Sequence, residues 1–163
     1  MLRRLLLLVC ATALAAAATA AGASASPAHA QRSAQLHVTL QNTAVHPGGS
    51  QWTSADGVVH ARGLPVTDDM VGDSGTLVGT ISRHINFDLD PSTGSSRAWC
   101  DFTMSFVDGP VVSGRCGGSL NGGLFAGHGD RSAVVGRYAL VAGGTPGVGP
   151  YALDMILVGR GTR

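Results

Sequence analysis

The stretch from 99 to 118 constrains the fold most, because it predicts a β-hairpin closed by a disulfide. Apolar side chains recur there at every second residue, the period of a strand with one buried face: Cys100, Phe102, Met104 and Phe106. The Asp-Gly-Pro segment at 108–110 supplies a turn, since glycine tolerates positive φ and proline fixes its own φ. This turn places Cys100 opposite Cys116, at roughly the 5.5 Å Cα separation that a disulfide prefers.

Residues 1–30 have the three parts of a secretory signal peptide. Two arginines precede an apolar run over 5–21, and small residues follow up to an Ala-His-Ala end. We predict cleavage after Ala30, with Ala25 as the fallback site. An uncleaved membrane anchor is the alternative, but it needs about 20 apolar residues, and this run is short and is followed by small residues. Either way, the sequence predicts an exported protein.

The cysteine count agrees with export. Cleavage removes Cys10, whose preceding valine and short apolar run argue against a lipoprotein signal. Two cysteines remain, Cys100 and Cys116, and pairing is the default in an oxidising compartment. Two free buried thiols are the alternative.

Composition limits both the fold and the chemistry. The remaining chain, residues 31–163, has the size of one domain. Every basic residue is Arg and every acidic residue is Asp, because the sequence contains no Lys and no Glu. Loss of two arginines with the signal peptide leaves nine Arg against ten Asp, a near-neutral balance that argues against nucleic-acid or anionic-membrane partners. The absence of lysine and glutamate also excludes a lysine Schiff base and glutamate acid–base chemistry.

The residues that usually fill exposed helix faces are scarce, and 24 glycines are present, so the sequence predicts an all-β domain. Turn residues separate apolar, often alternating segments, which we expect as strands at 35–40, 58–61, 76–90, 100–106, 119–128, 133–141 and 149–159. A long loop is expected over 42–56 and a polar connection over 66–74. Arg83 falls on the apolar face of its strand, which suggests a bulge or break nearby.

About eight strands without a helix indicate a small antiparallel β-barrel or a β-sandwich. We favour the barrel, because glycines within strand patterns suit tight corners: Gly79, Gly114, Gly127 and Gly136.

Three segments resemble the second half of the allene oxide cyclase and dirigent-like barrels: 122–127 (GGLFAG), 135–138 (VGRY) and 150–153 (PYAL). The resemblance spans about residues 72–159. It implies an eight-stranded barrel with an apolar cavity, of the kind found in secreted proteins that guide small hydrophobic molecules. No catalytic residue of that family maps onto this chain.

The tetrapeptide at 72–75 (GDSG) copies the surroundings of the nucleophile in trypsin-like serine proteases. The context disagrees, because Thr76 replaces a glycine, the chain is too short for two barrels, and His60 is the only candidate base at a short distance upstream. We therefore expect a polar turn.

No metal site and no cofactor are predicted. A metal site needs three or four converging ligands, whereas the five histidines left after cleavage lack spacings that put two of them on one face: His37, His46, His60, His84 and His128. The carboxylates of Asp68, Asp69 and Asp73 lack the order of a calcium loop.

Four aromatic residues are candidates for a ligand pocket: Trp52, Trp99, Tyr138 and Tyr151. Trp99 alternates away from Phe102, so we place it on the outer face, where an aromatic ring suggests a contact surface.

Together these features favour a secreted, non-enzymatic β-barrel that binds a small apolar ligand or a surface partner. A cyclase or isomerase of the dirigent type is the second reading, and an inward Arg83 or Arg137 in an open cavity would favour it. A structural extracellular protein with a filled core is the third. The sequence does not specify the ligand or the oligomeric state.

Overall fold

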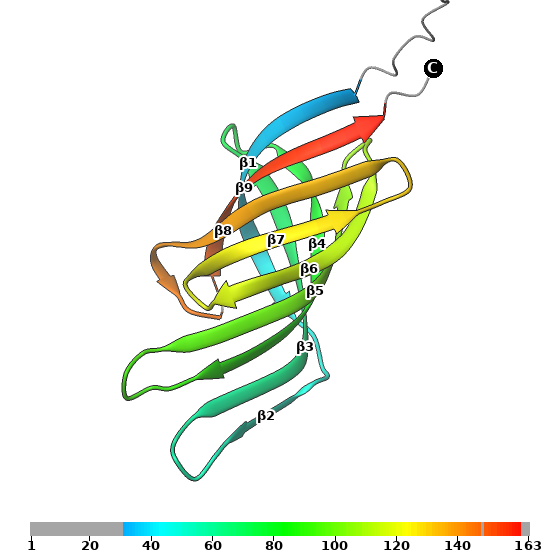
Figure 1. The fold of residues 1–163 in the computed structure, drawn as a ribbon. Helices are drawn as coiled ribbons and strands as arrows, with labels where there is room; N and C mark the ends of the chain where they lie inside the picture. Colours follow the sequence, from blue (N-terminus) through cyan, green and yellow to red (C-terminus); the bar gives the residue numbers. More distant parts are fainter. Residues whose placement is uncertain (1–30, 148, 161–163) are drawn as a thin grey trace, which may run out of the picture.

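The computed structural model describes residues 31–147 and 149–160, so the predicted signal peptide and its cleavage site lie outside the described residues. Nine antiparallel strands form one sheet (Figure 1): β1 (Gln31–Val45), β2 (Ser50–Thr53), β3 (Val59–Gly72), β4 (Leu77–Leu89), β5 (Ser96–Phe106), β6 (Val111–Ser119), β7 (Gly122–His128), β8 (Ser132–Thr145) and β9 (Gly149–Arg160).

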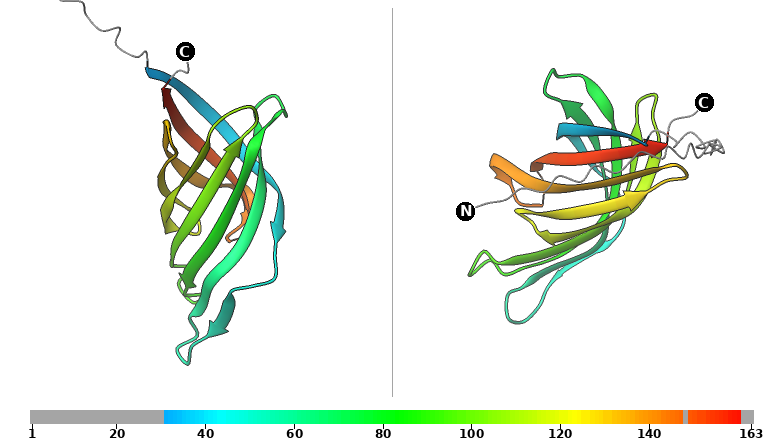
Figure 2. Two further views of the ribbon diagram at one scale, coloured as in Figure 1. Left: turned by 90° about the vertical axis from the view of Figure 1, so that its right-hand side faces the viewer. Right: turned by 45° about the horizontal axis from the view of Figure 1, so that its top comes forward.

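Pairing of β1 with β3 closes the sheet into a barrel. The strand order is β1-β9-β8-β7-β6-β5-β4-β3-β2, and the β1–β3 contact joins eight of these strands in a ring. Strand β2 pairs only with β3 among the described strands and extends past the ring at one end (Figures 1 and 2). The predicted all-β antiparallel barrel is confirmed, and the sandwich alternative is wrong.

The β5–β6 hairpin has the predicted register. Cys100 lies directly opposite Cys116, and the two form a disulfide with a Cα separation of 5.0 Å. The N–H of Phe106 donates to the carbonyl of Pro110 across the turn. Positive φ, however, falls on Asp108 (50°) and not on Gly109. Aspartate is one of the few residues besides glycine that tolerates this conformation.

Side chains from all eight barrel strands fill the interior. The buried set has one aromatic pair at its centre, because the rings of Phe102 and Phe125 meet edge to face at 5.8 Å. Glycines make room for these rings. A Cβ atom at Gly136 would lie 2.6 Å from Phe125 Cζ, and one at Gly127 would lie 3.0 Å from Phe102 Cζ. These glycines therefore allow close side-chain packing inside the barrel.

Two expected connections prove to be strands. The loop predicted over 42–56 contains the end of β1 and all of β2. The polar connection predicted over 66–74 is wrong, because β3 runs unbroken from Val59 to Gly72. Val66, Asp68 and Met70 alternate into the barrel on β3 and are all buried. Because the charged residue Asp68 occupies one of the inward positions, the sequence does not show the apolar alternation expected of a strand.

Arg83 does not interrupt its own strand. The β4–β5 pairing runs without a register shift from Gly79 to Leu89, and Arg83 pairs with Phe102 within it. The irregularities lie instead in the β3–β4 pairing, between Ala61 and Leu64 and between Met70 and Val71. Arg83 thus keeps its inward direction and enters the barrel interior.

Candidate functional site

A mostly apolar cavity of about 50 Å³ lies inside the barrel and is partly open to solvent. Strands β4, β5, β7 and β9 supply much of its wall, including Ile81, Phe102, Phe125 and Leu153. Such a volume exceeds the roughly 10–15 Å³ that one ordered water needs. The cavity accommodates a compact group of a few heavy atoms.

One ion pair lies within this apolar interior. Arg83 from β4 donates from Nη2 to Asp68 Oδ2 on β3 at 2.5 Å, and Thr43 Oγ1 donates to Asp68 Oδ1 at 2.6 Å. Only 1% of the Asp68 side chain and 13% of the Arg83 side chain are exposed. The Nε of Arg83 is buried and has no hydrogen-bond partner among the residues that the structure describes. Arg83 is also one of the residues that line the cavity.

Two tyrosines form another part of the cavity wall. Tyr138 donates to the carbonyl of Ser119, and Tyr151 donates to the carbonyl of Leu120. Burial raises the pKa of both phenols above 10.0, so both stay protonated and keep these bonds. The N–H of Gly147 in turn donates to Tyr151 Oη. Both tyrosine hydroxyls are therefore engaged in hydrogen bonds that stabilise the loops at this end of the barrel.

Both tryptophan rings lie close to the Arg62 guanidinium. Trp52 on β2 is 46% exposed and stacks on His60 with ring centroids 5.1 Å apart. The Arg62 guanidinium carbon lies 5.5 Å from the Trp52 ring centroid and 4.7 Å from that of Trp99. Trp99 also contributes to the cavity lining. The pocket expected from all four aromatic residues thus receives only Trp99, Tyr138 and Tyr151.

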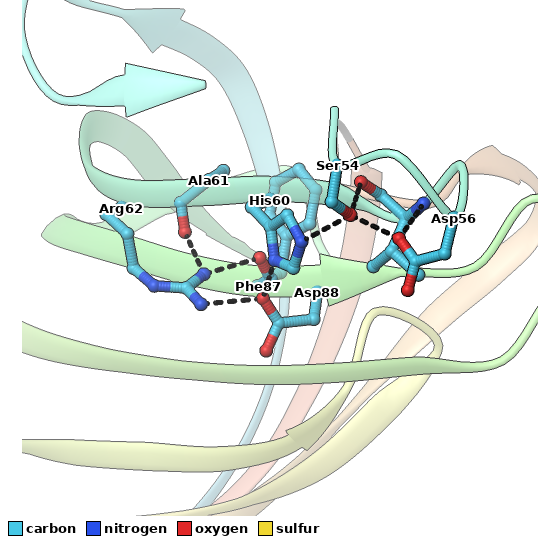
Figure 3. A network of polar contacts seen from close by, with 8 residues as sticks. Ser54, Asp56, His60, Ala61, Arg62, Phe87 and Asp88 are labelled. Atoms are coloured by element: carbon cyan, nitrogen blue, oxygen red, sulfur yellow. Dashed lines mark hydrogen bonds and ion pairs between the residues drawn. The ribbon is translucent and has the colours of Figure 1, made fainter. Parts of the chain in front are cut away.

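A second polar cluster lies at the hairpin joining β2 and β3, outside the ring (Figure 3). Ser54 Oγ lies 3.0 Å from His60 Nε2, and His60 Nδ1 lies 2.7 Å from Asp88 Oδ1. Arg62 donates to the same Asp88 oxygen at 2.7 Å. Ser54 Oγ also lies 2.5 Å from Asp56 Oδ1.

Hydrogen bonds within this cluster stabilise the ionised form of Asp88. The hydrogen bond from His60, followed by that from Arg62, lowers the pKa of Asp88 below 3.8. Asp88 is therefore ionised at neutral pH. Arg62 also donates to the carbonyls of Ala61 and Phe87, which fixes the guanidinium across β3 and β4.

Asp68 and Asp73, two of the carboxylates weighed as calcium ligands from the sequence, lie in different surroundings. Asp68 lies inside the barrel with Arg83, whereas Asp73 lies in the β3–β4 turn, 3.9 Å from His37. His37 Nδ1 instead lies 2.5 Å from Asp154 Oδ1. Within residues 31–147 and 149–160, no group of three or more His, Cys, Asp or Glu side chains could hold a metal ion.

The segment 72–75 forms the turn between β3 and β4. Gly75 N–H donates to the Gly72 carbonyl, and Ser74 Oγ lies 2.9 Å from Thr76 Oγ1. His60, the histidine weighed against Ser74 from the sequence, contacts Ser54 instead. The polar-turn interpretation is confirmed.

Sequence reasoning missed Asp68 as a partner of Arg83 and missed Ser54 beside His60. The sequence does contain a signal for the contact between Ser54 and His60. The Ser-Ala-Asp-Gly segment at 54–57 ends in the Asp-Gly pair typical of β-hairpin turns. Gly57 adopts positive φ (87°) there. The interior pair had no local signal, because 15 residues separate its members.

No helix in the part of the chain that the structure describes is long and apolar enough to cross a membrane. The sequence matches no known family model, and no curated protein shows significant similarity to it.

Proposed function

We propose that this protein is exported and binds a small, mainly apolar molecule in the barrel cavity, with Arg83 holding a hydrogen-bond acceptor on that molecule. The unpartnered Nε of Arg83 carries the proposal. A buried polar donor without a partner costs about 1–3 kcal/mol, and more when it is charged. An acceptor supplied by a ligand would remove this cost, whereas an all-apolar molecule would not.

The charge balance restricts the polar group of the ligand. Asp68 already neutralises Arg83 at 2.5 Å. A carboxylate on the ligand would place a second negative charge beside Asp68 in an apolar surrounding, which is unfavourable. A neutral acceptor, such as a ketone, aldehyde or amide carbonyl, meets the unused donor without that repulsion. We therefore expect carbonyl compounds to bind better than carboxylic acids of the same shape.

The cavity volume restricts its size. About 50 Å³ is far below the roughly 300–1,000 Å³ of pockets that enclose drug-sized ligands. The part of the ligand inside the barrel is accordingly compact, and a longer molecule would extend through the open side.

A cyclase or isomerase of the allene oxide cyclase or dirigent type is the second candidate. The inward direction of Arg83 supports it, since a fixed cation at the end of an apolar cavity can orient a reactive polar group. The two candidates differ in one observable. A binding protein returns the ligand unchanged, whereas a cyclase or isomerase releases a product of altered connectivity or stereochemistry.

The test is a binding screen of small ketones, their hydrocarbon analogues and the matching carboxylic acids, by ligand-detected NMR with recovery of the compounds. We expect at least one ketone to bind about tenfold more tightly than its hydrocarbon analogue. The doubly substituted Asp68→Asn/Arg83→Gln protein should lose that preference. Arg137→Gln, which changes an arginine with a 73% exposed side chain, should retain it.

Two results would overturn the binding proposal. One is the absence of saturable binding by any compound, which would favour a structural or surface-contact protein. The other is an unchanged ketone preference in the doubly substituted protein.

A further inference from the structure

We propose that Ser54, His60 and Asp88 form an acyl-transfer site, in which Ser54 accepts acyl groups from activated carboxylic esters. The site lies at the β2–β3 hairpin, outside the barrel ring, and does not depend on ligand binding in the cavity. Its three side chains come from the turn after β2, from β3 and from β4. Figure 3 shows them connected in series by dashed contacts, from Ser54 through the imidazole to Asp88.

The order of contacts matches the roles of nucleophile, base and orienting acid. Ionised Asp88 can only accept, so His60 Nδ1 carries the proton of their 2.7 Å bond. In the neutral imidazole, Nε2 is then the acceptor, and it lies 3.0 Å from Ser54 Oγ. This is the separation at which a histidine can remove the hydroxyl proton as the oxygen attacks.

Neighbouring groups hold the imidazole and the carboxylate in place. The Trp52 ring stacks on His60 at an interplanar angle of 22°. Arg62 donates to Asp88 and to two backbone carbonyls, so the carboxylate is fixed from a second direction. Both side chains remain accessible, since 21% of His60 and 32% of Asp88 are exposed. The geometry exists before any substrate arrives, which is what efficient proton transfer requires.

Asp56 opposes the reaction. Its carboxylate accepts from Ser54 Oγ at 2.5 Å, and the Val58 carbonyl lies 3.1 Å from the same hydroxyl oxygen, so both acceptors compete with His60 for the single hydroxyl proton. Asp56 also places a negative charge near the ester carbonyl, whose oxygen becomes negatively charged during the attack. Removing this charge while keeping an acceptor oxygen, as in Asp56→Asn, should therefore speed acylation. A purely structural network gives no reason for such an increase.

The chemical step is balanced with ester and water as the reactants. Ser54 Oγ bonds to the ester carbonyl carbon while its proton passes to His60 Nε2. The carbon–oxygen bond to the leaving group then breaks, the alcohol or phenol leaves with that proton, and Ser54 carries the acyl group. Water attacks the acyl carbon with His60 again taking a proton, which returns to Ser54 as the carboxylic acid departs.

The turn geometry limits the rate. The N–H groups of Ser54 and Gly57 donate to the carbonyls of Val58 and Ser54, so both are engaged within the turn. The developing oxyanion consequently faces water in place of these donors, and loss of one such donor typically costs about 10²–10³ in rate. We therefore expect slow turnover, restricted to esters with good leaving groups such as phenyl esters.

The experiment treats the disulfide-bonded protein with a fluorophosphonate probe and, separately, with p-nitrophenyl acetate. Peptide mass spectrometry should place the phosphonyl label on Ser54, and the ester should give a burst of nitrophenolate. Ser54→Ala should remove both signals. His60→Gln and Asp88→Asn should slow labelling by about a hundredfold, and Asp56→Asn should accelerate it several-fold.

A second hydroxyl–imidazole pair, formed between β3 and the segment that follows β1, serves as the control. Thr67 Oγ1 lies 3.0 Å from His46 Nε2, which reproduces the hydroxyl–imidazole contact with no carboxylate contact described for that imidazole. Thr67→Ala and His46→Gln should leave labelling unchanged. Labelling of the wild-type protein alone can overturn the proposal. If Ser54 carries no label, or if several surface serines are labelled equally, the cluster has only a structural role. A fall in labelling with Asp56→Asn would also contradict the proposal.

Discussion

Arg83 and Asp68 form an ion pair inside the barrel, with 2.5 Å between Nη2 and Oδ2 and only 1% of the Asp68 side chain exposed. Each residue alone would be a costly charge in an apolar interior. Substituting one partner leaves the other uncompensated, so we expect Asp68→Asn or Arg83→Gln to lower the free energy of unfolding by about 3–5 kcal/mol. Urea denaturation of the two single variants measures this loss.

The Asp68→Asn/Arg83→Gln protein should lose clearly less stability than the sum of the two single losses, because neither charge is left alone. The exposed pair of Arg115 and Asp101, 3.2 Å apart, is the matched comparison and should show little or no coupling. If the loss of unfolding free energy in the double variant equals the sum of the losses in the two single variants, the result would argue against a buried pair.

The disulfide should contribute measurable stability. Cys100 and Cys116 are 16 residues apart, and closing a loop of that length stabilises the folded state by about 3 kcal/mol in the chain-entropy model. We expect the Cys100→Ser/Cys116→Ser protein to unfold at a lower urea concentration by that amount. If the reduced wild-type protein unfolds at the same urea concentration as the oxidised one, the cross-link adds nothing.

A methyl group at Gly136 should not fit. The added Cβ would lie 2.3 Å from the Asp154 carbonyl oxygen and 2.6 Å from Phe125 Cζ. Overpacking of this kind costs typically about 1–3 kcal/mol. Thermal unfolding of Gly136→Ala should show that loss, whereas Gly117→Ala, where nothing lies within 4 Å of the new Cβ, should behave like the wild type.

The pKa of the His37 imidazole should lie above its ordinary value. Its hydrogen bond to Asp154 raises the pKa of the imidazole from 6.5, with smaller charge effects of Asp154 and Asp73 in the same direction. Histidine NMR signals followed against pH should show this shift, and Asp154→Asn should remove most of it. The associated stability is full below pH 6.5 and is lost as pH rises through the raised folded-state pKa. A His37 pKa that Asp154→Asn leaves unchanged would contradict this cause.

Local sequence patterns predicted the parts of the fold that depend on local chemistry. Strict alternation around Phe102 and Met104, together with the turn at 108–110, was enough to predict the β5–β6 register and the opposed cysteines. Those features depend on side-chain period and turn preference, both of which are readable within one hairpin.

Two of the failures share one physical origin. Asp68 made β3 look like a polar connection, and Arg83 made β4 look interrupted, yet each residue compensates the other across the β3–β4 pairing. A pattern of single residues cannot show that two charges will meet in the interior. The same holds for Asp88, which reaches His60 from a strand 28 residues away.

The pairing of Gln31 with Arg160 places both ends of the described chain next to each other. Register places the β2–β3 hairpin and the Ser119–Leu120 rim of the cavity at the opposite end of the barrel (Figure 1). An affinity tag, a surface anchor or a fusion partner attached next to residue 31 or 160 would therefore start at the end of the barrel opposite both candidate sites. A short peptide bridging residues 31 and 160 would also permit new termini elsewhere, so immobilised or circularly permuted forms should keep the cavity and the Ser54 hairpin accessible.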